Sequence, residues 1–211
     1  MTPVLLLTIG LTPNYDGISY QTLCSILELG SCVCPGVVED MELQLESRGA
    51  YSERSYPLYL KVLTTDENDP SVPDKERWNR LRFSVPAGII PKVKGDKSIF
   101  IPHGIRLLTD PNPGMRMDAR LMLVEIATAK DIPAVVKVID RDDPKKAGTA
   151  MEAAMVLSAI GGADEVKFLD ELSQCKAVQS DKEALRIVTG SRDALKARLE
   201  AKAKPSEKKD K

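Results

Sequence analysis

The chain has 211 residues, of which 43% are hydrophobic and 29% are charged, as in an ordinary soluble globular protein of one large or two small domains. Its 30 lysines and arginines balance 31 aspartates and glutamates, and the formal net charge of -1 provides no chain-wide attraction to nucleic acid or to an anionic membrane. Aromatic residues are only 4% of the chain and His103 is the one histidine, which argues against base-stacking platforms and histidine-rich metal sites.

The N-terminal segment contains an apolar run from Val4 to Leu7. This run is too short to span a bilayer, and it lacks the basic region and the small-residue cleavage site of a signal peptide. We therefore expect a buried strand or helix here, and a protein of the cytoplasm or of an assembled particle. A remnant of an export signal is the alternative.

Two helices are predicted in the next thirty residues or so. Thr22, Ile26 and Leu29 are spaced four and then three positions apart, which places them on one helix face. A second apolar set, from Val37 to Leu45, follows a Pro-Gly turn. The two segments are predicted to form a degenerate helix pair.

The four cysteines are Cys24, Cys32, Cys34 and Cys175. The spacing of Cys32 and Cys34 is not that of a zinc knuckle, and no second Cys/His pair follows. We expect reduced, mostly buried thiols, with a disulfide or a zinc site as the alternative. No cofactor and no metal is predicted.

The segment 48–105 is rich in proline and is interrupted by a polar run. Proline cannot donate a hydrogen bond to a helix or sheet, so short extended pieces are predicted in place of long elements. They are Leu58–Leu63, Leu81–Val85 and Ser98–Ile101. Residues 1–108 are therefore predicted to be a mixed or irregular region that contains short strands.

The C-terminal half contains an internal repeat with a shift of 34 positions. In each copy a first apolar triplet has spacing four then three, which forms one helix face, and a second apolar set follows after a short break. The first set is Ala119, Leu123 and Ile126, which recurs as Ala153, Leu157 and Ile160. The second set is Ile132, Val135 and Val138, which recurs as Val166, Leu169 and Leu172.

Each unit is therefore predicted to be a helix, a tight turn and a second helix. Stacking of successive units buries apolar stripes that neither helix can bury alone. The predicted core residues are Leu123, Ile126, Leu157, Ile160, Val166 and Leu169. An imperfect third copy follows residue 180, with a break at Gly190-Ser191. The helical-repeat domain is placed at 109–201, and a disordered, charged tail at 202–211.

The repeat resembles the HEAT family of α-solenoids, or an armadillo-like relative. The residues that carry the resemblance are Asp143-Pro144, Ala153, Leu157, Ile160-Gly161, Val166, Leu169 and Leu172, with their counterparts in the preceding copy. The resemblance implies a mainly α fold, a short stack of antiparallel helix pairs, which covers somewhat under half of the chain. An ordinary helical bundle is the alternative.

Catalytic and metal-binding interpretations have little support in the sequence. His103 lies between Pro102 and Gly104 without a partner motif, which is typical of a turn. The acidic run at 140–143 is followed by lysines, not by the distal glutamate of a calcium loop. We therefore predict that the chain is not an enzyme.

The predicted function is a scaffold or adaptor that binds a protein partner through its helical repeats, with no clear nucleic-acid partner and no membrane span. A structural subunit of a larger, self-assembling particle or envelope machine is one alternative, and a repeat-type lyase or lyase accessory subunit is another. The second helices of such repeats line a concave surface that engages partners. The predicted partner-binding residues are Lys137, Lys167, Asp170 and Glu171.

Overall fold

The computed structural model describes residues 17–29, 35–66, 68–72 and 74–203. This part of the chain is mainly helical and contains no β-strand. Its α-helices are α1 (Tyr20–Leu29), α2 (Pro35–Ser47), α3 (Tyr56–Thr64), α4 (Lys75–Ser84), α5 (Ile101–Leu107), α6 (Pro113–Ile126), α7 (Ile132–Lys137), α8 (Ala147–Ile160), α9 (Ala163–Ser173), α10 (Lys176–Gln179) and α11 (Lys182–Ala203). None of the helices in these ranges is long and apolar enough to cross a membrane.

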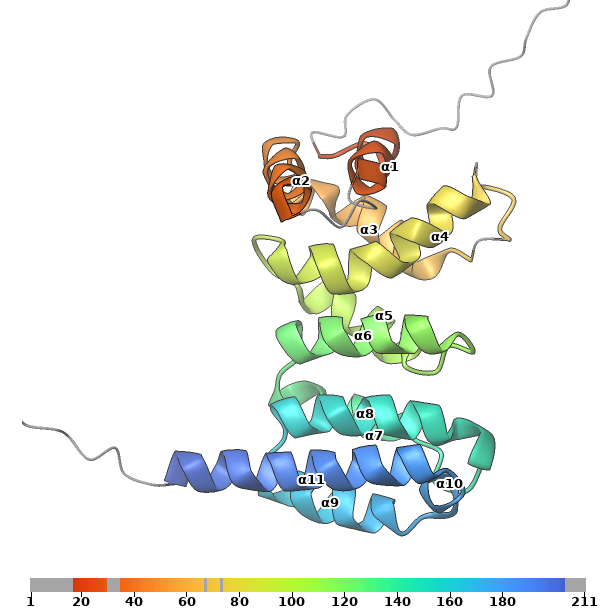
Figure 1. The fold of residues 1–211 in the computed structure, drawn as a ribbon, viewed down its shortest axis with the longest axis vertical. Coiled ribbons are helices and arrows are strands. Elements are labelled where there is room, and N and C mark those ends of the chain that lie inside the picture. Colours follow the sequence, from red (N-terminus) through yellow and green to blue (C-terminus); the bar gives the residue numbers. More distant parts are fainter. Residues whose placement is uncertain (1–16, 30–34, 67, 73, 204–211) are drawn as a thin grey trace, which may run out of the picture.

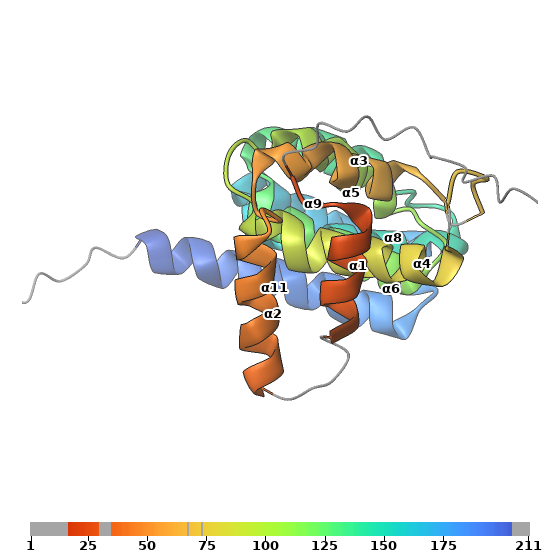
Figure 2. The ribbon, with the colours of Figure 1, turned by 90° about the horizontal axis from the view of Figure 1, so that it is seen from above.

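The helices lie in successive levels along the long axis of the molecule (Figure 1). From α3 onward they form two rows: α3, α5, α7 and α9 lie in one, and α4, α6, α8 and α11 in the other (Figures 1 and 2). In the second row α6 packs on α8, and α8 packs on α11. Helices α1 and α2 pack against each other across one end, with their axes turned away from those of the rows (Figure 2). The predicted helix pair at the N-terminal end is therefore confirmed.

Short polar side chains fix where several helices begin. Asp74 accepts a hydrogen bond from the backbone N–H of Arg77 (3.1 Å) at the start of α4. Asn112 accepts one from Gly114 (2.9 Å) at the start of α6. Such N-caps satisfy backbone donors that have no partner within the helix.

The predicted short strands are wrong. Leu58–Leu63 lies in α3, Leu81–Val85 covers the end of α4, and Ser98–Ile101 is a 3₁₀ turn that continues into α5. The prolines begin short helices here: Pro57 and Pro102 occupy the first turns of α3 and α5. The missing N–H of proline costs nothing at that position, because the first backbone donors of a helix have no intrahelical acceptor.

The predicted pairing of repeat helices differs from the one observed. The sequence paired α6 with α7 and α8 with α9, whereas the antiparallel pairs in contact are α5 with α6, α7 with α8, and α9 with α11. Both the predicted and the observed pairs give the same period of 34 residues. The length of a repeat therefore does not show which helix begins each unit. The pair α5/α6 also spans the boundary predicted at residue 108.

The predicted break at Gly190-Ser191 is also wrong, because α11 continues through it to Ala203. A glycine inside a helix costs about 1 kcal/mol relative to alanine. Burial of Ala184, Val188 and Leu195 on one side of α11 offsets that cost.

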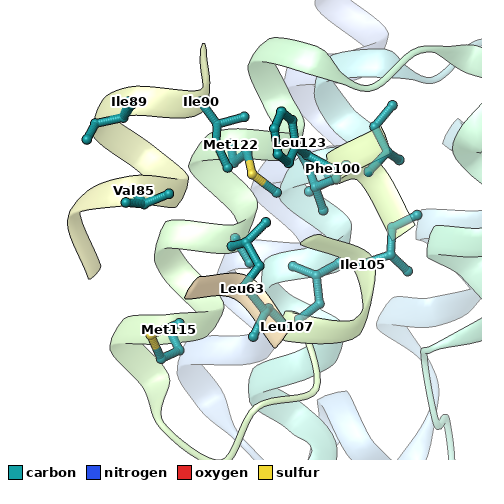
Figure 3. Packing of buried hydrophobic residues seen from close by; sticks show 14 of the residues in the cluster. Leu63, Val85, Ile89, Ile90, Phe100, Ile105, Leu107, Met115, Met122 and Leu123 are labelled. Atoms are coloured by element: carbon teal, nitrogen blue, oxygen red, sulfur yellow. The ribbon is translucent and has the colours of Figure 1, made fainter. Parts of the chain in front are cut away.

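The predicted core residues all lie on the inner side of their helices. Leu123, Leu157 and Leu169 are completely buried, while Ile126, Ile160 and Val166 are partly buried and pack against the core. In the neighbouring part of the core, Met122 and Leu123 of α6 lie against α5 (Figure 3). A Cβ atom on Gly104 would come within 2.3 Å of the Met122 methyl group, so glycine is what permits this close approach.

Replacement of Leu157 by alanine is expected to lower the free energy of unfolding by about 2–5 kcal/mol, because it leaves a cavity at a fully buried position. Urea denaturation followed by circular dichroism measures this change. The exposed residue Leu43 provides the control, since Leu43→Ala is expected to change stability by no more than about 0.5 kcal/mol. Equal stabilities of the two variants would contradict the assigned core.

Candidate functional site

The four predicted partner-binding residues are all exposed. Lys137 lies at the end of α7, and Lys167, Asp170 and Glu171 lie on α9. Their outward orientation agrees with the prediction. Because α7 and α9 are the first helices of the observed pairs, however, these residues do not lie on second helices. Lys167 and Asp170 line one groove, whereas Lys137 and Glu171 lie outside it.

The groove runs between α9 and α11 and has a volume of about 540 Å³. Helical spacing explains how it forms, because each helix contributes side chains three or four positions apart. The lining residues are Ala163, Val166, Lys167 and Asp170 from α9, and Arg192, Asp193, Lys196, Leu199 and Glu200 from α11. Three positive and three negative side chains therefore surround a small apolar floor.

Arg192 joins the two walls of the groove. Its guanidinium group lies 2.6 Å from the carboxylate of Asp170 and 2.9 Å from that of Asp193. Hydrogen bonds to these two carboxylates raise the pKa of Arg192 above its usual value. These two ion pairs involve two of the three negative side chains of the groove and one of the three positive ones.

The remaining charges of the groove are Lys167, Lys196 and Glu200. Within the part of the chain that the structure describes, none of the three has an ion-pair partner or a side-chain hydrogen bond. Between them, Val166 and Leu199 are partly exposed while they also pack against the core. The groove thus combines an apolar floor with two lysines that can accept a carboxylate.

Glu171 has a separate, local role. Its carboxylate lies 3.5 Å from the guanidinium group of Arg141, which also lies over the ring of Phe168 at 4.6 Å from the centroid. These contacts tie α9 to the turn before α8. Glu171 therefore positions α9, and it contributes no side chain to the groove.

The α11 side of the groove was missed by the sequence analysis. The predicted third copy was defined by its apolar positions, so Arg192 and Lys196 were not grouped with Leu199 on one face. Their spacing of four and then three is the signal that could have identified this face.

Two acidic residues are buried in the row formed by α4, α6, α8 and α11. Glu152 of α8 lies 2.8 Å from the Nε atom of Arg120 of α6, although this N–H is not aligned for a hydrogen bond. Burial raises the pKa of Glu152, and the nearby guanidinium groups of Arg120 and Arg116 partly offset that effect. The pair joins α6 to α8 away from solvent.

Asp118 of α6 is the second buried acid, with 8% of its surface exposed. It shares a face of α6 with the buried residues Met115 and Met122. Burial raises the pKa of Asp118 to about 6, and the charge of Arg120 opposes the shift only in part. A carboxyl group in such surroundings is more stable when it is protonated.

Replacement of Asp118 by asparagine is expected to stabilise the protein at pH 7.5 and to have little effect at pH 4. The folded-state pKa lies above the unfolded value, so the wild-type protein loses stability as the pH rises through about 6. The loss amounts to roughly 2–3 kcal/mol when about 1.4 kcal/mol is taken for each pKa unit. Denaturant titrations of both proteins across this range measure it, and parallel stability curves would contradict the assignment.

The other candidate chemical groups remain isolated in the described residues. His103 lies in α5 and not in a turn, and partial burial lowers its pKa. Cys24 is a buried free thiol and Cys175 a partly exposed one, while Cys32 and Cys34 lie outside the described residues. No three His, Cys, Asp or Glu side chains within the described ranges come together as a metal site.

Comparison with known proteins identifies no relative. The chain matches no protein-family model, no curated protein and no solved structure. The resemblance to HEAT repeats therefore stays a prediction from the sequence.

Proposed function

We propose that this chain is a protein-binding scaffold, a short α-solenoid of stacked helix pairs with a binding role and not a catalytic one. Its binding site is the groove between α9 and α11, at the C-terminal end of the stack. The occupant is a segment of another protein. Its apolar side chain enters the groove, and aspartate or glutamate residues flank that side chain in the segment. This proposal keeps Lys167 and Asp170 in the site and places Lys137 and Glu171 outside it.

The observation that supports this proposal most strongly is the combination of Lys167 and Lys196 with the apolar floor at Val166 and Leu199. An apolar centre surrounded by polar groups is the usual anatomy of a specific protein interface. Among the described residues neither lysine has an ion-pair partner, so a carboxylate on the ligand gains an ion pair without breaking one of these contacts. The Arg192–Asp170 contact, at 2.6 Å, holds the two walls at a fixed separation before any ligand arrives.

Selection from a displayed library of random peptides tests the proposal. The selected peptides are expected to share an apolar residue flanked by aspartate or glutamate. Simultaneous replacement of Lys167 and Lys196 by glutamate should weaken their binding at least about tenfold, because it places like charges against the ligand. Isothermal titration calorimetry measures the dissociation constants.

The matched control replaces Lys137 and Lys176 by glutamate. Both lysines are exposed and lie outside the groove, so this variant has the same change in net charge. It should bind the selected peptides as the wild-type protein does. Equal affinity of both double variants would place binding elsewhere on the molecule, and failure to select any acidic peptide would contradict the proposed ligand.

A further inference from the structure

Helices α6 and α8 together present an apolar outer face. Met117 and Leu121 are one turn apart on α6 and have 44% and 40% of their surfaces exposed. Met151 and Met155 are one turn apart on α8 and are partly exposed. We call these four residues the α6/α8 face. The ion pair between Arg120 and Glu152 links α6 to α8 next to these residues, so all four side chains lie along the same boundary between the two helices.

Helix α8 is almost free of charge, and none of its side chains is more than partly exposed. Glu152 is the single charged residue among its 14 residues, and it is buried against Arg120. A surface helix normally presents charged or polar side chains to water, whereas a helix that is apolar on all sides is normally covered. The outer side of α8 therefore has the composition of a buried surface.

The neighbouring helices extend this surface. Phe83 of α4 is 37% exposed and lies beside the first turn of α6, where a Cβ atom on Gly114 would come within 3.0 Å of its ring. On the other side, α11 carries the exposed small residues Gly190 and Ala194. The four helices have 10, 14, 14 and 22 residues and are therefore about 15–33 Å long. Packed about 10 Å apart, they span roughly 900 Å², close to what each partner contributes to a standard interface.

Most charges around the face are paired within the chain, while Glu125 of α6 is exposed one turn beyond Leu121. Glu76 and Arg80 of α4 lie 2.6 Å apart, as do Glu183 and Arg186 of α11. The four residues of the face carry no charge, so the part of an occupant that lies on them must be apolar. The same face of a second copy meets this requirement, and the net charge of -1 gives two copies little mutual repulsion.

We propose that two copies of this chain associate through their α6/α8 faces into a two-fold symmetric dimer. In such an interface the same patch of each copy contacts the other, and flexible methionine side chains adapt to each other across the axis. The proposal uses a surface separate from the α9/α11 groove. Peptide binding in the groove and dimer formation can therefore each fail without the other.

Sedimentation equilibrium on the full chain tests the dimer. At about 0.1 mM the wild-type mass should be twice the 23.1 kDa of one chain. Met117→Lys and Met155→Lys should each raise the dimer dissociation constant at least about tenfold, because each places a charge in the apolar interface. Leu43→Lys makes the same kind of change at an exposed site on α2, outside the face, and should leave the dimer intact.

Two results would overturn the proposal: a single-chain mass for the wild-type protein, or dissociation of Leu43→Lys to the same extent as the two face variants. A measurement on the wild-type protein removes any dependence on how the variants fold. With isotopically labelled methionine methyl groups and a soluble paramagnetic probe, Met117, Met151 and Met155 should be shielded nearly as well as Met122, which is completely buried in α6. Full accessibility of the three methyl groups would also refute the dimer.

Discussion

The structure depends on the close packing of α8 between α6 and α11. Helix α8 contacts both of these neighbours in its own row, and α7 and α9 in the other row. Only small side chains allow several helices to approach one helix in this way, and Ala147, Ala150, Ala153 and Ala154 provide them, since all four are buried. Alanine also has the highest helix propensity, so α8 keeps its shape without charged side chains. The composition that permits this packing leaves the outer side of α8 apolar, which is the basis of the proposed dimer.

Polar contacts then fix how the neighbours of α8 are placed. Arg120 of α6 meets Glu152 in its middle, and Arg116 approaches Gly148 so closely that a Cβ atom there would lie 2.6 Å from the guanidinium group. At the other end, Arg198 of α11 donates to the carbonyl of Gly161 just beyond the last turn of α8 (2.6 Å). This contact fixes one side of α11 against α8. The side of α11 that carries Arg192 and Lys196 then lines the groove with α9. The two proposed binding surfaces thus both follow from how α6 and α11 pack on α8.

The sequence predicted the helices of the C-terminal half because their apolar residues recur with helical spacing. Leu123, Leu157 and Leu169 repeat on that spacing, and all three are buried. It did not predict the pairing, because the contacts between α5 and α6 join a proline-rich segment to the repeat, and no local pattern marks them. Proline was interpreted as a breaker where Pro57 and Pro102 begin helices. The groove was half predicted: Lys167 and Asp170 were named, while Arg192 and Lys196 on the α11 wall are charged positions that no apolar periodicity marks.

The central claim is that α8 unites the helices on both sides of it into one cooperative unit. Native-state hydrogen exchange tests this claim at individual amides. The amides between Ala153 and Leu157 in α8 should exchange only through global unfolding, with the same free energy as those between Ala119 and Leu123 in α6 and as that obtained from denaturant titration. Exchange of the α8 amides through a local opening of lower free energy, while α6 stays protected, would contradict the account.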